Sequence, residues 1–309
     1  MVRKVTIGLA QMAMGREPAR NLDRATGMVR DAAAQGADVV CLPELFTSLY
    51  FAQYANPAGP GNVPEGARGK ADAPLEEIPG DASRRLSECA AANKVILVAG
   101  SVYEKAATGF FNTAMTFGRD GRMLGKYRKI HIPHDESFYE QHYFAPGDLG
   151  FKVYATDKGN IGTLICYDQW FPEAARANAL MGADIVLYPT AIGTAQGLDQ
   201  AEGGWQEAWE NVMRGHAIAN GMVVAACNRA GHEGRMDFWG GSLVIDAFGK
   251  TLARAGGDEQ ILLATVDLEH GREVREGWRF FHNRRPDQYG ELVERRRDGG
   301  RDGKKGCDD

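Results

Sequence analysis

The sequence has few cysteines and none of the spacings that mark disulfide-rich or zinc-binding proteins. Five cysteines are spread over 309 residues, and no two of them form a C-x-x-C pair. An odd number of widely spaced cysteines argues against a disulfide scaffold and against a zinc site. Any cysteine with a special role is therefore expected to be a free thiol.

Long apolar runs and a strong charge bias are also missing. No stretch approaches about 18 apolar residues, the length that spans a membrane, and the N-terminus lacks the basic and apolar regions of a signal peptide. The net charge of −5, from 36 Lys and Arg against 41 Asp and Glu, is too small to indicate nucleic acid or an anionic membrane as a partner. We expect a cytoplasmic protein whose partners are small molecules.

The composition is that of an ordinary globular protein. Hydrophobic residues make up 44% of the chain and charged residues 25%, which excludes the disordered, collagen-like and coiled-coil classes. Although the length would allow two domains, we expect one domain over residues 1–294. Residues 295–309 form a charged, glycine-rich stretch that we expect to be a mobile tail.

Apolar runs rich in β-branched residues alternate with helical stretches, which predicts an α/β fold. Strands are expected at residues 5–12, 38–42, 95–102, 113–117, 161–166, 184–188, 222–227, 242–246 and 261–267. Helices are expected at residues 19–35, 82–93, 173–181 and 205–220. The dipeptides Asp120-Gly121 and Phe248-Gly249 indicate hairpin turns.

Two stretches of the chain repeat one pattern. Residues 36–40 read Gly-Ala-Asp-Val-Val and lead to Pro43, and residues 182–186 read Gly-Ala-Asp-Ile-Val and lead to Pro189. Each is typical of a helix end, a glycine C-cap and a buried strand that stops at a proline. The pattern predicts a two-fold internal repeat.

Cys166 lies between an apolar run and a helix. The run Ile-Gly-Thr-Leu-Ile covers residues 161–165, and Pro172 opens the next helix. A thiol on a sharp turn between a strand and a helix would lie near N–H groups that stabilise a thiolate or a developing oxyanion. Taken alone, Cys166 is better explained as a buried core residue, because free cysteines are among the most buried residues.

Two charged residues are candidate helpers for such a thiol. Glu44 stands where an apolar strand ends, which is where open α/β sheets place ligands, and a partly buried carboxylate suits proton transfer. Lys129 lies in a cationic cluster, and strand alternation puts it on the side of Tyr127 and His131. Each also has a simpler explanation: Glu44 as a helix start or salt bridge, and Lys129 as a solvated surface residue.

Taken together, these residues resemble the Glu, Lys and Cys triad of the nitrilase superfamily. The resemblance is carried by Pro43-Glu44, residues 126–133 and residues 166–173, and it extends from about residue 5 to about residue 289. It implies an αββα four-layer sandwich, a homodimer or larger homo-oligomer, and no metal or organic cofactor. Glu140 falls on the family's second glutamate, which orients the lysine, although taken alone it is a surface residue of an aromatic-rich loop.

Within the superfamily, the sequence is most similar to N-carbamoylputrescine amidohydrolases. The matching segments are residues 131–133, 138–140, 143–144, 146–148, 188–193, 215–217, 228–229 and 284–287. The resemblance implies a small carbamoyl-amine substrate that is cleaved to putrescine, ammonia and carbon dioxide. In the implied mechanism Glu44 takes the proton of Cys166, while Lys129 and a backbone N–H near Tyr167 hold the oxyanion.

The residues around the triad predict the character of the substrate pocket. Relatives that act on N-carbamoyl amino acids carry arginines after the nucleophile, which suit a carboxylate, whereas this chain has Gln169-Trp170. Acidic side chains that could attract a distal ammonium are Asp135, Glu136, Asp168 and Asp199. The residues expected to line the pocket are Tyr50, His131, Tyr167, Trp170 and Ala191.

Three other interpretations stay open. A nitrilase, aliphatic amidase or ureidopropionase would use the same triad on another carbonyl or nitrile. A catalytically silent α/β protein would bind a partner through its sheet edge or tail, and its Cys166 would be inert toward iodoacetamide at neutral pH. A dinucleotide-binding enzyme is disfavoured, because no G-x-G-x-x-G follows the first expected strand.

Overall fold

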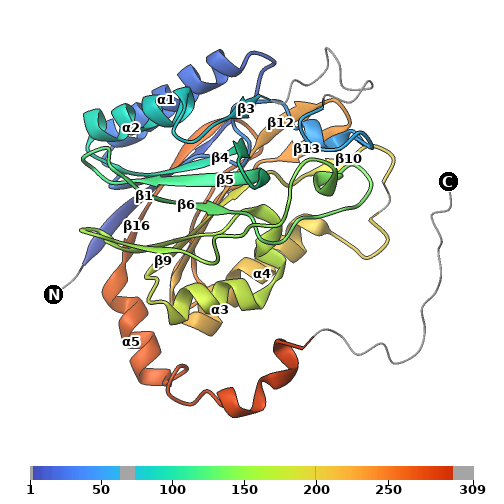
Figure 1. Cartoon of the computed structure of the whole chain (residues 1–309). Helices are drawn as coiled ribbons and strands as arrows, with labels where there is room; N and C mark the ends of the chain where they lie inside the picture. The colour runs from blue at the N-terminus through green and yellow to red at the C-terminus, as the bar shows by residue number, and fades with distance from the viewer. Residues whose placement is uncertain (1–2, 63–73, 199, 295–309) are drawn as a thin grey trace, which may run out of the picture.

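The computed structural model describes residues 3–62, 74–198 and 200–294. Two stacked β-sheets form its centre, and helices cover the outer face of each sheet (Figure 1). The first sheet has the strand order β16-β1-β2-β4-β5-β6, with β3 beside β4. Its strands are β1 (Lys4–Gln11), β2 (Val39–Cys41), β3 (Leu75–Glu76), β4 (Ile96–Ala106), β5 (Gly109–Phe117), β6 (Met123–Arg128) and β16 (Gln260–Asp267).

The second sheet has the order β15-β14-β11-β9-β8-β7, and a small third sheet has the order β10-β13-β12. The strands of the second sheet are β7 (Val153–Thr156), β8 (Gly159–Thr163), β9 (Ile185–Thr190), β11 (Val223–Asn228), β14 (Leu243–Ile245) and β15 (Thr251–Arg254). Those of the third are β10 (Thr194–Ala195), β12 (Ala230–Glu233) and β13 (Met236–Trp239). The α-helices are α1 (Pro18–Ala34), α2 (Asp81–Asn93), α3 (Pro172–Leu180), α4 (Trp205–Asn220) and α5 (Leu268–Trp278).

Apolar cores separate the layers of this sandwich. Ile185 and Leu187 of β9 pack between the two sheets, whereas the alternate residues Val186 and Tyr188 pack against α3 and α4. A third core lies between the first sheet and the helices α1 and α2. Strands buried on both faces carry near-continuous apolar runs, which is why the sequence shows little polar alternation there. The architecture is the αββα sandwich expected from the sequence.

The two sheets share the internal repeat that the sequence predicts. Strands β1, β2 and β4 form a parallel trio in one sheet, and β8, β9 and β11 form its counterpart in the other. Before β2 and β9 the chain leaves its helix through Gly36 and Gly182, whose φ angles of +95° and +92° favour glycine. Asp38 then accepts the N–H of Thr6 at 3.0 Å, and Asp184 accepts the N–H of Asn160 at 2.9 Å.

The expected strands and helices are all found, with ends that differ by a few residues. The strand expected at residues 161–166 stops at Thr163, because the chain turns at Cys166 into a short 3-10 helix, η4 (Cys166–Trp170). Both expected hairpins are confirmed, as β5–β6 and β14–β15. Helix α5 has no counterpart among the expectations, since only Leu268, Gly271 and Val274 of its eleven residues are buried.

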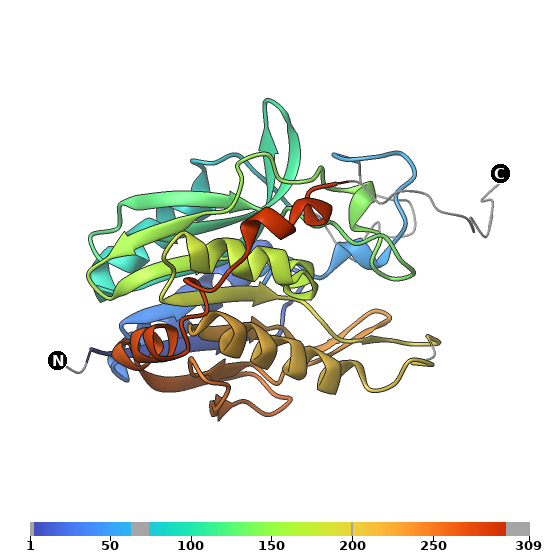
Figure 2. The ribbon, with the colours of Figure 1, turned by 90° about the horizontal axis from the view of Figure 1, so that it is seen from below.

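The segment after α5 lies across α3 (Figure 2). It contains two further 3-10 helices, η5 (Pro286–Gln288) and η6 (Gly290–Leu292). The tail expected at residues 295–309 falls outside the described residues. Within the described ranges, no helix combines the length and the apolar character needed to cross a bilayer.

Candidate active site

The candidate catalytic residues lie at the ends of strands from both sheets. Strands β2 and β6 run in the same direction, so Glu44 and Lys129, which follow them, emerge at the same edge. Cys166 opens η4 after β8, and Glu140 opens the 3-10 helix η3 (Glu140–His142). The N–H of Glu44 donates to the carbonyl of Thr190 at 3.4 Å. This contact joins the carboxyl ends of parallel strands in the two sheets, which is where α/β folds place their ligands.

Lys129 forms a buried ion-pair network with two carboxylates. Its Nζ lies 2.8 Å from Glu44 Oε1 and 2.7 Å from Glu140 Oε2, and all three side chains are buried. Asn112 Nδ2 donates to Glu44 Oε1 at 2.8 Å, and Tyr50 O–H donates to Glu140 Oε1 at 3.0 Å. The carboxylates therefore have fixed orientations before any substrate arrives.

The charges of this network change the protonation of its members. Burial raises the pKa of Glu140 to about 7, although the ammonium of Lys129 acts in the opposite direction. Burial opposes the charged form of Lys129, but the carboxylates of Glu140 and Glu44 outweigh it and raise the pKa of the lysine. Lys129 is thus a fixed ammonium at neutral pH.

Cys166 lies beside this network and keeps its proton at rest. Burial and the neighbouring carboxylate of Glu44 raise the pKa of the thiol well above its usual range, while Lys129 acts in the opposite direction. Among the described residues, the buried oxygen Glu44 Oε2 has no hydrogen-bond partner. A carboxylate oxygen that is free to accept, next to a protonated thiol, is suited to take the thiol proton when the sulfur attacks.

A cavity of about 420 Å³ opens onto the thiol. Cys166 and Glu140 lie in its wall, and so do three of the residues expected there, namely Tyr167, Trp170 and Ala191. The remaining described residues of the wall are Pro133, His134, Asp135, Phe138, Ile192, Glu202, Trp205 and Ala208. The cavity is enclosed by aromatic and aliphatic groups, with acidic side chains among them.

The comparison with known proteins agrees with this geometry. The model of the carbon-nitrogen hydrolase family matches residues 6–276, which is most of the chain. The chain belongs to the carbon-nitrogen hydrolase family.

It is 37% identical to an N-carbamoylputrescine amidase of Arabidopsis thaliana, over 94% of this chain and 96% of that protein. It is 35% identical to a citrullinase of Francisella tularensis, over 94% of this chain and 98% of that protein. A crystal structure of a carbon-nitrogen hydrolase from Helicobacter pylori superimposes with a TM-score of 0.82 at 37% identity, covering 94% of this chain and 99% of that one.

Tyr50 and His131, expected to line the substrate cavity of this hydrolase, are not among the described residues of its wall. Tyr50 is fully buried, and its hydroxyl donates a hydrogen bond to Glu140. The ring of His131 stacks on Phe171, with the ring centroids 3.7 Å apart, and its Nδ1 lies 2.7 Å from Asp168 Oδ1. Tyr50 is fully buried and His131 is partly buried, and both contact carboxylates of the catalytic network or beside it.

The acidic residues expected to attract a distal ammonium differ in whether they reach the cavity. Asp168 is fully buried and its carboxylate is occupied by protein donors, so it is not available to a substrate. Glu136 pairs with Arg235 at 3.0 Å and is not among the lining residues, whereas Asp135 lines the cavity. Asp199 lies outside the described residues.

Glu202 is a lining residue of the hydrolase that the sequence does not single out. It stands in a glycine-containing turn before α4, with no local motif to mark it. Its Oε1 accepts a hydrogen bond from Trp205 Nε1 at 2.8 Å. With Asp135, it gives the cavity two carboxylates in addition to Glu140.

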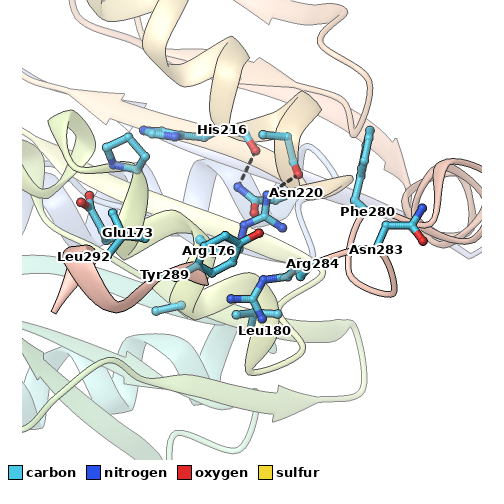
Figure 3. Close-up of a pocket in the computed structure, with 13 residues that line it drawn as sticks. Glu173, Arg176, Leu180, His216, Asn220, Phe280, Asn283, Arg284, Tyr289 and Leu292 are labelled. Carbon is cyan, nitrogen blue, oxygen red and sulfur yellow. Dashed lines mark hydrogen bonds between the residues drawn. The ribbon is translucent and has the colours of Figure 1, made fainter. Parts of the chain in front are cut away.

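A separate cavity of about 640 Å³ lies between α3, α4 and the C-terminal segment (Figure 3). Arg176, His216, Asn220 and Tyr289 are among its lining residues, and no cysteine is. It therefore does not offer the nucleophile that defines the first cavity. Within the described ranges, no group of three or more His, Cys, Asp or Glu side chains is arranged to hold a metal ion.

Proposed function

We propose that this carbon-nitrogen hydrolase cleaves the carbamoyl C–N bond of N-carbamoylputrescine, giving putrescine, ammonia and carbon dioxide. The observation that supports it most is the free oxygen of Glu44 beside a protonated Cys166, with the Lys129 ammonium on the other oxygen of the same carboxylate. The base and the cation thus lie together behind the nucleophile, and the nucleophile faces a cavity of suitable size for a small amine.

In the first half of the reaction Cys166 attacks the carbamoyl carbon. Glu44 Oε2 accepts the thiol proton as the S–C bond forms, and the carbonyl electrons move to an oxyanion held by Lys129 and the N–H of Tyr167. Glu44 then passes the proton to the terminal nitrogen, which leaves as ammonia. A thiocarbamate that joins Cys166 to the alkylamine nitrogen remains.

In the second half, water enters where ammonia has left. Glu44 takes one proton from the water as its oxygen attacks the thiocarbamate carbon, and the sulfur leaves and regains a proton. The released carbamic acid decomposes to the amine and carbon dioxide. Each half-reaction uses the same carboxylate once as base and once as acid, so the site returns to its starting protonation state.

The charge of the cavity favours an amine end over a carboxylate end. Among the described residues that line it, none is a lysine or an arginine, whereas Asp135 and Glu202 are acidic. N-carbamoylputrescine ends in an ammonium alone, whereas citrulline carries an additional carboxylate that this wall does not neutralise. The likeness to a citrullinase makes citrulline the second candidate substrate.

The proposal is tested by mass spectrometry of the intact protein after a brief exposure to N-carbamoylputrescine. We expect an adduct on Cys166 that retains the diamine, because ammonia leaves first. An adduct of the carbamoyl group without the diamine would reverse the order of departure. Ammonia release from N-carbamoylputrescine, citrulline, an N-carbamoyl amino acid and a simple amide should be measured side by side, and a preference for any of the last three would refute the proposed substrate.

Removing both acidic side chains of the cavity should reduce the recognition of the ammonium. We expect Asp135→Asn with Glu202→Gln to lower kcat/KM for N-carbamoylputrescine about tenfold, since exposed charges contribute modestly. Butylurea, which has the same chain without the ammonium, should be hydrolysed as by the parent enzyme. Glu136→Gln, which removes a single negative charge outside the cavity, serves as the control for a general charge effect. Equal losses for both substrates would contradict the assignment.

The pH dependence of kcat should report the ionisation of Glu140. With its pKa near 7, activity should fall as the pH drops through that value, because a protonated Glu140 no longer pairs with Lys129. Tyr50→Phe removes a donor that stabilises the charged carboxylate, so the pKa should rise and the acid limb should move to higher pH, by about 0.5–1 unit. Tyr143→Phe, whose hydroxyl donates to backbone carbonyls in the same aromatic cluster, should leave the limb in place. Profiles measured between about pH 5 and pH 9 decide between these outcomes.

A further inference from the structure

The nucleophile of the proposed reaction stands in a strained backbone turn. The φ angle of Cys166 is +42°, in the left-handed region that is unfavourable for a residue with a side chain. Such a conformation persists only where the surrounding contacts hold it. The contacts that hold this turn therefore bear on the position of the sulfur.

Asp168 provides several of these contacts. Its Oδ2 accepts the N–H of Ile165 at 2.9 Å and the O–H of Tyr127 at 2.7 Å. Its Oδ1 accepts the N–H of His131 at 3.1 Å and lies 2.7 Å from Nδ1 of the same residue. The carboxylate is fully buried, so each of these bonds is made away from water.

The donors to Asp168 come from two chain segments that carry the chemistry. Ile165 precedes Cys166, whereas Tyr127 and His131 stand two residues before and two residues after Lys129. One carboxylate therefore ties the turn of the thiol to both flanks of the lysine. The backbone of Lys129 is bonded in addition to the first sheet, through its N–H to the carbonyl of Asn112 at 2.9 Å.

The surroundings of Asp168 support this arrangement. Burial and the negative charge of Asp168 raise the pKa of Tyr127 well above its usual range, so its hydroxyl remains a donor. The ring of His131 is held parallel to Phe171, at an interplanar angle of 7°, and Phe171 is the N-cap of α3. Neither flank of the lysine is free to rotate away from the turn.

We propose that Asp168 is a positioning residue that fixes the Lys129 ammonium against the Cys166 thiol. It touches neither the cavity nor the reacting atoms, and it acts through the two residues on which the proposed function rests. A carboxylate is required because only an acceptor can receive all of these donors at once. An amide in its place must turn its N–H group either toward Tyr127 and Ile165 or toward His131. The donors on that side then lose their acceptor, and the chain segment that carries them is no longer held.

The test combines turnover with the chemical reactivity of the thiol in Asp168→Asn. We expect kcat to fall about 100-fold, because a small displacement of reacting groups has effects of that size. The rate of alkylation of Cys166 by iodoacetamide, relative to Cys89 in the same molecule, should fall about tenfold as the stabilising ammonium moves away. Alkylation needs no substrate, so it separates this inference from the choice of substrate.

Asp184→Asn is the matched control. Asp184 occupies the other end of β9, where it accepts the N–H of Asn160 and pairs with Arg275, and it serves the fold alone. It should lower the melting temperature without changing kcat or the alkylation ratio. Tyr127→Phe removes one donor without disturbing the carboxylate, and it should lower kcat about tenfold even if Asp168→Asn fails to fold.

The outcomes are decisive in each direction. A folded Asp168→Asn or Tyr127→Phe protein with kcat within about threefold of the parent, or with an unchanged alkylation ratio, would overturn the positioning role. A parent enzyme in which Cys166 is inert toward iodoacetamide at neutral pH would instead refute the proposed function itself.

Discussion

Replacing Cys166 with alanine is expected to abolish turnover, with a loss in kcat of more than about 10⁴-fold. No group in the site can take over the attack on the carbamoyl carbon, because the neighbouring side chains of Glu44, Lys129 and Glu140 already form a paired network. The fold should survive, since exchanging a thiol for a hydrogen atom alters the free energy of unfolding by about 1 kcal/mol. Ammonia release and thermal unfolding of the same sample measure both quantities.

Cys89→Ala is the matched control for this variant. Cys89 is a half-buried cysteine on α2, in the core between that helix and the first sheet, away from the cavity. It should lose a comparable amount of stability and no activity. Turnover by the Cys166→Ala protein within about tenfold of the parent would remove the nucleophile from the mechanism.

Replacing Lys129 with methionine should reduce both catalysis and stability. The substitution leaves Glu44 and Glu140 buried without their counterion, which is expected to cost about 3–5 kcal/mol. For a chain of this size that corresponds to a fall in melting temperature of about 10 °C. The loss of the ammonium at the oxyanion should lower kcat about 10³-fold.

The stability loss of Lys129→Met should depend on pH in a defined direction. Without the ammonium, the pKa of Glu140 rises further above that of the unfolded chain, so the folded protein binds a proton that the unfolded chain does not. The deficit should therefore be largest above neutral pH and shrink as the pH falls. Melting temperatures of parent and variant across this range measure it.

Two further variants separate the roles of the lysine. Lys129→Met with Glu140→Gln removes one of the stranded charges, so it should recover part of the melting temperature and none of the activity. Lys126→Met removes a lysine of the same strand whose partner, Glu104, retains Arg128. It should leave kcat unchanged. Recovery of activity in the double variant would mean that Lys129 has no part in the chemistry.

The layers of the fold could be predicted from the sequence because each rests on a local pattern. The apolar runs of β2 and β9, each preceded by Gly-Ala-Asp, predicted both the buried strands and the repeat that relates them. Helix α5 escaped prediction because charged residues and few apolar ones make up most of its surface.

The candidate site could be predicted only in part. Glu44 and Cys166 each follow a recognisable strand, and the combination with Lys129 resembles a known triad. No sequence motif marks the hydrogen bonds of Asp168 that support these residues. Asp168 and His131 are 37 residues apart, and whether a histidine faces a cavity or a buried carboxylate depends on tertiary contacts that no spacing encodes.

Sequence also left the substrate end of the site undetermined. Tyr50 was a reasonable candidate for the pocket because it is an aromatic residue near Glu44, yet its hydroxyl is consumed by Glu140. Glu202 reaches the cavity from a turn before α4 and carries no motif. Substrate specificity therefore depends on loop residues, and the sandwich, not the composition of the loops, determines where these residues lie.

The hydrogen bond from Glu44 to Thr190 has a consequence for how the enzyme is assembled. Glu44, Lys129 and Glu140 belong to the first of the two repeated halves, and the sulfur of Cys166 belongs to the second, so neither half contains all the catalytic groups. The two similar halves therefore contribute different catalytic groups to one site. A small separation of the two halves near Glu44 and Thr190 would therefore abolish activity while both sheets remained folded.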